Sequence, residues 1–380
     1  MGLKPIIEFR FWEKKIHLFH LWGFLGFLCG VTLGMALTIK QGLPLLVLGL
    51  MSLCGAATFF AHVYMQKWIA GNEKLVYYRH EIAILTINSG MLWLIHQPVL
   101  PFLDITLLGV GTFLAFGRVG CYNVGCCHGR PSTIGAIYTE AHAHEGFPLY
   151  YVGIKIFPLP LVESFFVAIT VAIGVWLFLS SFPHGTVLIW YTVFYGAVRF
   201  MLEFFRGDSE RPYFLGLSEA QWTTWILIIL SVIGSLTGGL PYYLGQMIVV
   251  MIISMTSIII IVFNKNWKIY RLLNPAHIHQ LAEGLYNLTP TKSSENTPVK
   301  IQRTNLGVSY SYGKIVVSDG TMEHFTFSNN EPNLILDTNS IKQLVKYIKT
   351  IQKINVKPNI IEKVNGVFQV TFWQPNSTDP

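Results

Sequence analysis

The stretch that decides the fold is residues 117–131, GRVGCYNVGCCHGRP. It holds four glycines, two arginines, three cysteines and one histidine, and long apolar segments flank it on both sides. Glycines let the backbone approach a ligand closely or adopt a positive φ. Two guanidinium groups beside a hydrophobic span are costly unless an anionic or acidic group meets them. The stretch therefore predicts an anion site at a membrane surface, where a phosphate head group would satisfy the arginines.

The composition of the 380 residues is that of an integral membrane protein. Hydrophobic residues make up 52% and charged residues 12%, whereas soluble domains carry about 25% charged residues. The mean hydropathy is +0.47. A net charge of +7 would suit a nucleic-acid partner, but the basic residues lie between apolar segments and in the tail. Such cations flank membrane spans and face lipid head groups. We therefore expect membrane lipid as a partner and no nucleic acid.

Eight apolar segments are candidates for membrane spans. They are residues 16–39, 45–68, 76–95, 102–116, 161–182, 187–205, 222–240 and 242–263. The fourth is short for a complete span, so we expect it to be tilted, broken or extended into the glycine–cysteine stretch. Four cations precede the first segment and no clear cleavage motif follows it, so we expect a span and not a removed signal peptide. The sequence predicts an all-α polytopic bundle of 7–8 helices within residues 1–264.

The composition changes after residue 264. Residues 265–298 begin with flanking cations and continue as a Thr/Ser/Pro/Asn-rich segment, which predicts a basic juxtamembrane segment and a linker. Residues 299–380 are predicted to form a small α+β soluble domain. Its expected strands include residues 315–317 and 367–372, and its helix is expected at 341–354, capped by Ser340. This domain carries no obvious catalytic constellation, so we interpret it as accessory.

A second apolar segment carries charge at residues 195–208, YGAVRFMLEFFRGD. Tyr195, Arg199 and Glu203 are spaced by four and therefore share one helical face. A self-neutralising ion pair between helices is one interpretation. Ionisable residues in spans usually face a cavity or a pathway, so we favour a functional role. Arg199 would grip a phosphate while the carboxylate of Glu203 fixes its orientation.

These segments resemble the prolipoprotein diacylglyceryl transferase family. GRVG at residues 117–120, followed by Gly125 and by GRPS at 129–132, resembles the family signature. Leu161-Val162-Glu163 after Pro158 resembles the start of the family's next span, and residues 195–206 resemble its later Tyr-Gly…Arg-Phe…Glu-Phe-x-Arg helix. Asp104 also lies a suitable distance before Arg118. The resemblance covers roughly residues 16–240 and excludes the tail.

The resemblance implies transfer of the diacylglyceryl group of phosphatidylglycerol to a cysteine thiol of a lipoprotein precursor peptide. Glycerol phosphate leaves, no cofactor or metal is needed, and the setting is the bacterial plasma (inner) membrane. Arg118 and Arg199 would handle the phosphate, with Glu203 orienting Arg199. Paired guanidiniums would stabilise the charge that grows on the departing phosphate. The further residues that the resemblance places at the substrate are Gly117, Gly120, Gly129, Arg130, Glu163, Tyr195 and Arg206.

The base for the incoming thiol has two candidates. The family carries a histidine in a His-Gly-Gly segment of the third span, and the matching region here is Tyr78-Arg79-His80-Glu81. His80 is our candidate catalytic base, because a histidine titrates near neutral pH. The gap-free register would instead favour Tyr78. An interfacial pair between His80 and Glu81 is the structural alternative.

The cysteines depart from the family pattern. Cys121 and Val124 stand where the family has asparagine, and Cys126 stands where it has glutamate. We favour free thiols packed beside the glycines, so no metal is expected. A disulfide from Cys121 to Cys126 or Cys127 is one alternative, and a metal site including His128 is another, although its spacing is not a standard one. Competing functions are a related phospholipid-dependent transferase with another acceptor and a metal- or redox-sensing membrane protein.

Two arguments place the glycine–cysteine stretch on opposite sides of the membrane. The excess of Lys and Arg in the loops and termini favours the cytoplasmic side. The family resemblance implies the outer side, where exported precursors emerge. We favour the outer side, because arginines with a functional role should not be counted toward topology.

Overall fold

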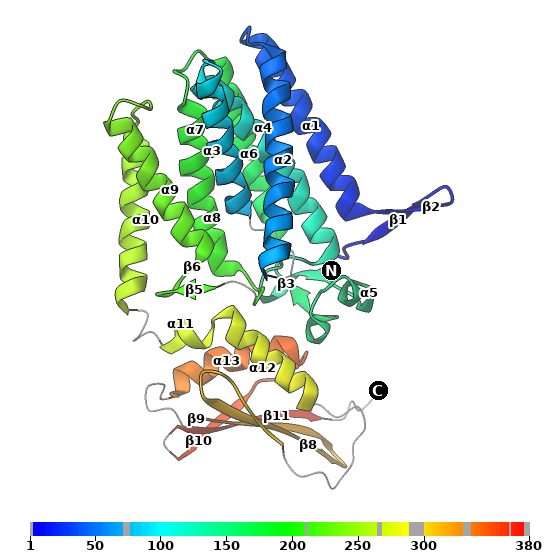
Figure 1. The fold of residues 1–380 in the computed structure, drawn as a ribbon. Helices are drawn as coiled ribbons and strands as arrows, with labels where there is room; N and C mark the ends of the chain where they lie inside the picture. Colours follow the sequence, from blue (N-terminus) through cyan, green and yellow to red (C-terminus); the bar gives the residue numbers. More distant parts are fainter. Residues whose placement is uncertain are drawn as a thin grey trace.

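A bundle of long helices stands on a smaller module of sheet and helices (Figure 1). The computed structural model describes residues 3–70, 77–209, 212–263, 268–288, 300–329, 336–364 and 366–375. The predicted linker at 289–298 lies outside these residues. The combination of a polytopic helical bundle with a C-terminal α+β module confirms the predicted fold class.

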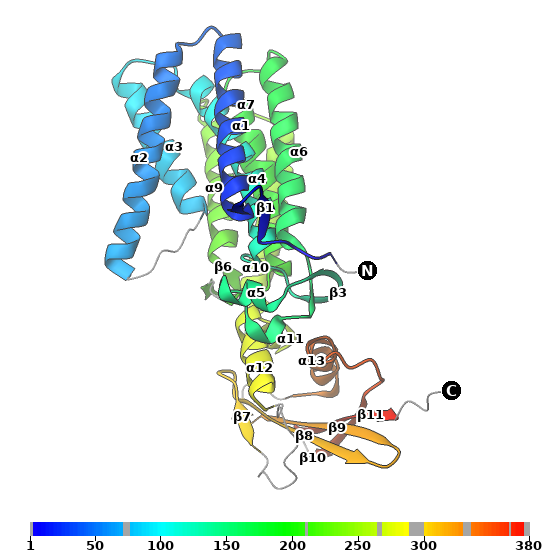
Figure 2. The same cartoon turned by 90° about the vertical axis from the view of Figure 1, so that its right-hand side faces the viewer.

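The bundle is formed by eight helices that alternate in direction along the chain (Figures 1 and 2). Seven are continuous: α1 (Leu18–Lys40), α2 (Leu45–Ala70), α3 (Tyr77–Leu94), α4 (Val99–Val124), α6 (Leu159–Leu179), α9 (Glu219–Leu236) and α10 (Leu244–Phe263). The remaining helix is the sixth along the chain and is called the eighth helix below. It consists of α7 (Thr186–Trp190), the π-helical turn η2 (Tyr191–Tyr195), α8 (Gly196–Leu202) and the 3₁₀ turn η3 (Glu203–Phe205). Within the described residues, seven of the eight are long and apolar enough to span a membrane, and α3 is the exception. The chain is therefore a multi-pass membrane protein.

The fourth helix is longer than its apolar core. The sequence left open whether the segment at 102–116 is tilted, broken or extended, and the structure shows an extended helix that continues to Val124. It ends at Gly125, which has a φ of 80° that glycine adopts without strain. Arg118 and Cys121 consequently lie on the last turns of α4 and not in a loop.

Close contact of backbones joins α1 to α4. Gly26, Gly30 and Gly34 follow one another at intervals of four on α1 and are buried. A Cβ on Gly30 would lie 2.7 Å from the carbonyl oxygen of Gly109. Small residues at such a spacing let membrane helices approach until their backbones touch. The glycines of the first span are therefore packing residues.

Short elements cover the end of the bundle at which α4 and α8 terminate. The N-terminal hairpin consists of β1 (Glu8–Phe11) and β2 (Lys14–His17), which the sequence analysis did not predict. After α4 follow β3 (Pro131–Ile137), α5 (Glu140–His144), the 3₁₀ turn η1 (Leu149–Tyr151) and β4 (Lys155–Ile156), and β5 (Tyr213–Phe214) and β6 (Leu217–Ser218) precede α9. Buried aromatic side chains such as Tyr138, Phe147 and Tyr151 form the core of this layer.

The C-terminal module is a five-stranded antiparallel sheet with helices on one face. Its strands, in the order β10-β11-β9-β8-β7, are β10 (Asn359–Val364), β11 (Val367–Pro375), β9 (Gly320–Asn329), β8 (Val308–Val317) and β7 (Ile301–Arg303). The helices α11 (Lys268–Leu272), α12 (Pro275–Leu288) and α13 (Thr338–Ile351) lie between the sheet and the bundle (Figures 1 and 2). Residues of α12 share one hydrophobic core with the sheet and α13. The two expected strands are confirmed. The predicted helix begins at Thr338 and is capped by Asp337, so the proposed Ser340 cap was wrong: Ser340 donates its backbone N–H to the Asp337 side chain at 2.7 Å.

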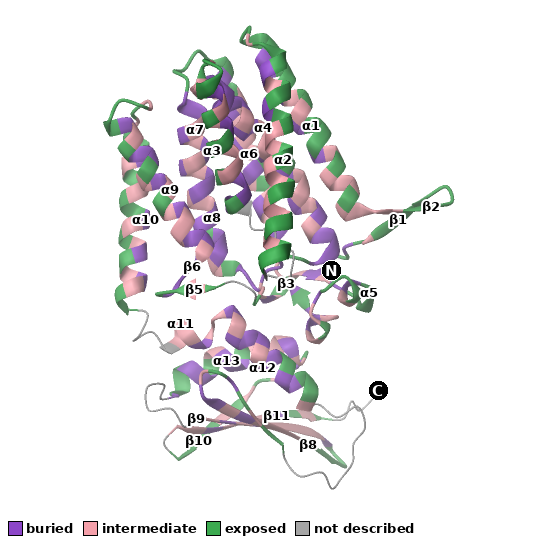
Figure 3. Ribbon diagram, viewed as in Figure 1, coloured by how far each residue is buried: buried purple, intermediate pink, exposed green. Residues whose placement is uncertain are grey.

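Burial differs between the helices of the bundle. Buried residues follow α4 and α7–α8, whereas α2 and α10 are largely exposed (Figure 3). Exposed apolar side chains such as Leu46, Leu53 and Met255 face outward, as they do toward lipid tails. The buried charged side chains of the bundle include Arg118 on α4, Glu163 on α6 and Arg199 on α8, where the sequence predicted function.

Candidate active site

A chain of ion pairs joins three helices, near the point where α4 and α8 end and α6 begins. Nε of Arg118 on α4 lies 2.9 Å from Oε2 of Glu163 on α6. The other oxygen of Glu163 lies 3.6 Å from Nε of Arg199 on α8. Arg199 Nη1 in turn lies 2.6 Å from Oε2 of Glu203. All four side chains are buried. The structure thus brings together the two arginines and Glu203 from the sequence analysis, and Glu163 joins them.

The geometry of this ionic centre follows from the helices that carry it. The four-residue spacing of Tyr195, Arg199 and Glu203 sets all three on the face of the eighth helix that meets α4 and α6. Tyr195 donates from its hydroxyl to Glu163 Oε1 at 2.9 Å. The π-helical turn that ends at Tyr195 adds a residue to the helix just before this point, and such turns are frequent at functional sites.

The charges of the ionic centre balance. Two guanidiniums face two carboxylates, and buried charges persist only when they are paired. A carboxylate occupies only part of the donor set of an arginine, which has five N–H groups. The arginines can therefore stay charged within the bundle and still offer donors to an anion.

Gly129-Arg130-Pro131, called the GRP turn below, packs against the end of the eighth helix through two glycines. Gly129 pairs with Arg206 in an antiparallel bridge, and the backbone N–H of Gly207 donates to the His128 carbonyl at 3.0 Å. A Cβ on Gly129 would lie 2.5 Å from the Phe157 carbonyl oxygen, and one on Gly207 would lie 2.1 Å from the Gly129 carbonyl oxygen. The two segments therefore approach so closely that only glycine fits.

The structure places Arg130 and Arg206 outside the ionic centre, with partners of their own. Arg206 is fully buried and pairs with Asp208. Arg130 donates from Nε to the Arg206 carbonyl at 3.1 Å and from Nη1 to the Leu273 carbonyl at 3.0 Å. Arg130 thus ties the turn to both the eighth helix and the C-terminal module.

The two other glycines of the signature differ in their surroundings. A Cβ on Gly120 would contact Phe19 at 3.3 Å, so Gly120 is a packing residue between α4 and α1. A Cβ on Gly117 would have no described atom within 4 Å. Gly117 therefore leaves open space immediately beside Arg118.

Three cysteines lie at the end of α4. The sulfur atoms of Cys121, Cys126 and Cys127 all lie within 4.8 Å of one another, and all three are free thiols. Hydrogen bonds from the side chains of Cys121 and Cys126, aided by the charges of Arg206 and Arg118, hold the pKa of the Cys127 thiol well below its usual range, although burial acts in the opposite direction.

His80 lies on the side of α3 that faces α2. Its buried ring packs against the rings of Phe59 and His62, at centroid distances of 4.8 and 4.7 Å. Tyr78 projects from the other side of α3 toward the eighth helix and α9, and its hydroxyl is hydrogen-bonded to Thr224 Oγ1 at 2.8 Å. The structure therefore places Tyr78 nearer the ionic centre, in the register that the sequence analysis held open.

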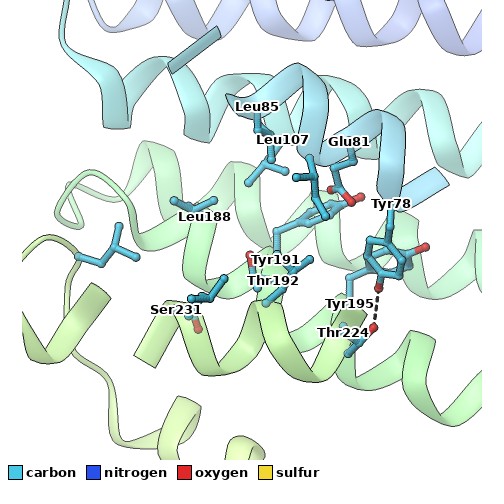
Figure 4. A pocket seen from close by; sticks show the side chains of 15 residues that line it. Tyr78, Glu81, Leu85, Leu107, Leu188, Tyr191, Thr192, Tyr195, Thr224 and Ser231 are labelled. Carbon is cyan, nitrogen blue, oxygen red and sulfur yellow. Dashed lines mark hydrogen bonds between the residues drawn. The ribbon is translucent and has the colours of Figure 1, made fainter. Parts of the chain in front are cut away.

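An apolar cavity adjoins the ionic centre. It has a volume of about 220 Å³ and is lined by residues of α3, α4, α9 and the eighth helix. On α3 its lining residues are Tyr78, Glu81, Ile82 and Leu85, one face of that helix. Tyr195 is one of the side chains that line the cavity (Figure 4). Its hydroxyl also donates to Glu163 Oε1. Tyr195 thus connects the cavity to the ionic centre, whose four charged side chains are not among those that line the cavity.

The sequence that carries this site matches a known protein family. The family described as prolipoprotein diacylglyceryl transferase matches residues 6–237. The chain belongs to this family. The match includes the ionic centre and the GRP turn and ends before the C-terminal module, as the resemblance in the motifs predicted. It therefore confirms the recognition made from the sequence.

Individual relatives share part of the chain. A protein of Clostridium tetani named phosphatidylglycerol–prolipoprotein diacylglyceryl transferase is 29% identical over 136 residues, which are 35% of this chain and 52% of that protein. Proteins with the same function in their names from Clostridium perfringens and Dehalococcoides mccartyi are 30% identical over 134 and 132 residues. These regions cover 34% of this chain in both cases, and 49% and 48% of the two relatives. The chain spans about half the length of the relatives it matches.

Sequence reasoning missed several members of the site. Asp208 pairs with Arg206 two residues away, and the Arg-Gly-Asp order was a local signal for that pair. Thr224 and Tyr191 line the cavity, and only the fold brings them there. Two long-range contacts had no signal in the sequence: Arg130 donates to the Leu273 carbonyl, 143 residues away, and His279 on α12 donates to the Gly207 carbonyl, 72 residues away.

Proposed function

We propose that this family member transfers the diacylglyceryl group of phosphatidylglycerol to the cysteine thiol of a lipoprotein precursor peptide, at a bacterial plasma (inner) membrane. The observation that carries the proposal is the ionic centre of Arg118, Glu163, Arg199 and Glu203, buried in the bundle beside an apolar cavity. Family membership and the names of the relatives support the same substrate pair.

The lipid phosphate meets Arg118 and Arg199. It takes guanidinium donors that Glu163 and Glu203 leave available, and the open space at Gly117 admits it beside Arg118. The acceptor thiolate attacks the glyceryl carbon, the carbon–oxygen bond to the phosphate breaks, and glycerol phosphate departs. The phosphate gains negative charge in this step, so paired guanidiniums bind the transition state better than the starting diester.

The carboxylates and the GRP turn keep the arginines in position. Glu203 and Glu163 fix the guanidinium planes of Arg199 and Arg118, and Tyr195 holds Glu163. Gly129, Arg130 and Arg206 form the rim of the site through their backbone contacts. Gly120 sets the distance between α4 and α1.

Part of one acyl chain next to the glyceryl group enters the cavity, whose volume of about 220 Å³ is too small for two whole chains. Most of its lining consists of leucine, isoleucine and tyrosine side chains, which suit an acyl chain, while Glu81, Thr192, Thr224 and Ser231 are polar. Because Tyr195 belongs to both the cavity and the ionic centre, a lipid in the cavity has its phosphate at the arginines.

Two residues are candidates for the proton of the acceptor thiol. His80 is the candidate from the family motif, and Tyr78 is the one that lines the cavity. The variants His80→Gln and Tyr78→Phe separate them. Transfer that survives in one variant and fails in the other identifies the side chain that the reaction needs.

The test is a transfer assay with the full chain in vesicles that contain phosphatidylglycerol, with a precursor peptide that carries one cysteine. Wild type should form a thioether-linked diacylglyceryl peptide. Arg118→Ala and Arg199→Ala should each lower the rate by about 10²-fold or more, because each removes charge stabilisation of the leaving phosphate. Arg10→Ala, on the exposed hairpin, is the matched control and should keep the wild-type rate. A folded wild type that gives no thioether product would overturn the proposal.

A further inference from the structure

The three thiols at the end of α4 converge because of how that helix ends. Cys121 lies on its last turn, and Gly125 turns the chain back with a φ of 80°. Cys127 has a φ of 55°, a left-handed conformation that a residue with a side chain rarely adopts. The thiol of Cys126 folds back and donates to the Cys121 carbonyl at 3.8 Å. The spacing that seemed unsuitable for a metal in the sequence therefore brings three sulfur atoms within 4.8 Å of one another.

The sulfur atoms lie in a cationic environment. Arg118 lies three residues before Cys121 on α4, and Arg206 pairs with Gly129, two residues after Cys127. A divalent ion with three thiolates would carry one net negative charge, which these arginines offset. Arg118 also belongs to the ionic centre, so the cysteines and the proposed phosphate site share a residue.

The ligand set is incomplete in the manner of a catalytic metal site. Within the described part of the chain, no histidine, aspartate or glutamate joins the three sulfur atoms. His128 is adjacent in sequence, but its Nδ1 donates to the Gly129 carbonyl at 2.8 Å and its ring packs against Phe147 and Tyr151. Structural zinc sites are closed by four protein ligands, whereas catalytic ones keep a position for water or substrate. Cys126 is exposed, so the fourth position faces outward.

We propose that Cys121, Cys126 and Cys127 bind Zn²⁺ and that the fourth position binds the thiol of the acceptor cysteine. Thiolate ligands select soft or borderline ions such as Zn²⁺, and a thiol that coordinates zinc loses its proton at neutral pH. The metal would thus activate the acceptor thiol in place of a side-chain base, so neither His80 nor Tyr78 would be needed for this proton. This inference rests on the proposed transferase function and assigns the activation of the thiol to a site of its own.

The step balances without a redox partner. The acceptor thiol gives its proton to water as it binds Zn²⁺, and its sulfur then attacks the glyceryl carbon. A carbon–sulfur bond forms, and the carbon–oxygen bond to the phosphate breaks. The electron pair of that bond leaves with the phosphate, whose second negative charge meets Arg118 and Arg199. The product is a neutral thioether, a weaker zinc ligand than a thiolate, so it can leave the metal.

Metal content is the first measurement. The full chain is purified in detergent with a thiol reductant and loaded with Zn²⁺, and bound zinc is measured by elemental analysis. We expect one zinc per chain with a submicromolar dissociation constant. The double variant Cys126→Ser/Cys127→Ser should lose it, and Cys54→Ser, in α2, should keep it. Sub-stoichiometric zinc in the wild type, or zinc that the double variant retains, would overturn the inference.

The open position is tested with Co²⁺ in place of zinc. The cobalt protein should show thiolate-to-metal absorption, and a peptide with one cysteine should change this spectrum. The same peptide with serine in place of that cysteine should not. A spectrum unchanged by the cysteine peptide would mean that the metal does not bind the acceptor, and the proposal would fail even if zinc is present.

Activity separates this inference from the proposed function. Removal of zinc with a chelator should lower transfer by about 10²-fold or more, and Zn²⁺ should restore it. Arg118→Ala should lose transfer but keep its zinc. If the metal-free wild type transfers lipid at the full rate, the zinc inference is wrong and the transferase stands. If zinc binds stoichiometrically, the cobalt protein responds to the cysteine peptide and no lipid is transferred, then the transferase function is wrong.

Discussion

Glu163→Gln tests the ionic centre most directly, because it removes one charge and keeps the size of the side chain. Glu163 Oε2 lies 2.9 Å from Nε of Arg118, and Oε1 accepts from Tyr195 at 2.9 Å and lies 3.6 Å from Nε of Arg199. Glutamine offers only one acceptor oxygen. Its NH₂ group would face a guanidinium or a hydroxyl donor, so one buried cation loses its counter-charge.

The expected loss of stability follows from these contacts. Breaking a buried ion pair by removing one partner costs about 3–5 kcal/mol. Glu203 still balances Arg199, so we expect the lower end, about 3 kcal/mol. At about 2.1 cal/mol/K per residue, the 380 residues have an unfolding entropy of about 0.8 kcal/mol/K, so a loss of about 3 kcal/mol should lower the thermal midpoint by about 4 °C. Glu8→Gln, whose partner Lys15 is 78% exposed, should change stability by less than about 0.5 kcal/mol.

The assay is thermal unfolding of the purified variants, followed by tryptophan fluorescence in nanodiscs of two compositions. In phosphatidylcholine the full loss should appear. In phosphatidylglycerol part of it should be recovered, because a bound anionic phosphate would replace the missing charge at Arg118. If Glu163→Gln unfolds at the same temperature as Glu8→Gln in both lipids, the ion pairs do not stabilise the bundle and the reasoning is refuted.

Three further predictions concern packing, a buried cap and pH. Gly30→Ala should lower the free energy of unfolding by about 1–3 kcal/mol, because its Cβ would lie 2.7 Å from the Gly109 carbonyl oxygen. Gly23→Ala on the same helix should be neutral or slightly stabilising, and equal thermal midpoints for the two variants would contradict this prediction. Asp104→Asn should cost about 1–3 kcal/mol, since the carboxylate accepts from the backbone N–H groups of Gly185 at 2.7 Å and Leu188 at 2.8 Å, and hydrogen exchange at Leu188 should quicken. Burial lowers the pKa of His279 to about 4, so between pH 6.5 and 4 the unfolded chain binds a proton that the folded chain does not bind. The free energy of unfolding should therefore fall as the pH drops from 6.5 toward 4. His279→Gln should flatten this slope by up to about 1.4 kcal/mol per pH unit, and an unchanged slope would show that His279 is not the group responsible.

The sequence predicted the parts of the fold that depend on hydropathy. Each apolar segment became a helix, because a bundle in lipid must satisfy every backbone polar group within the helix itself. The end of α4 was harder, because glycines, charges and cysteines between residues 117 and 124 are typical of a loop. The helix continues there because Arg118 pairs with Glu163 and Gly120 packs against Phe19. Both contacts join segments that are distant in the chain.

The candidate site was predicted as residue types and not as an arrangement. The spacing of Tyr195, Arg199 and Glu203 is local and was visible in the sequence. The position of Glu163 between two arginines depends on how α6 packs against α4 and α8, which no local pattern records. The same applies to the C-terminal module. Its strands and helix were visible in part, but the hydrogen bond from His279 on α12 to the Gly207 carbonyl needed the fold.

The balance of charge in the ionic centre explains how a membrane bundle can hold a site for an anion. Arginines without partners would be too costly among apolar helices, so Glu163 and Glu203 are needed before any lipid binds. A phosphodiester brings one negative charge and shares the guanidiniums with these carboxylates. The departing phosphate monoester carries a second charge, and it gains more from Arg118 and Arg199 than the diester does. The arginines would therefore stabilise the transition state more than the substrate, which is what acceleration of the proposed transfer requires, while the carboxylates hold the guanidinium groups in place and keep the empty site neutral.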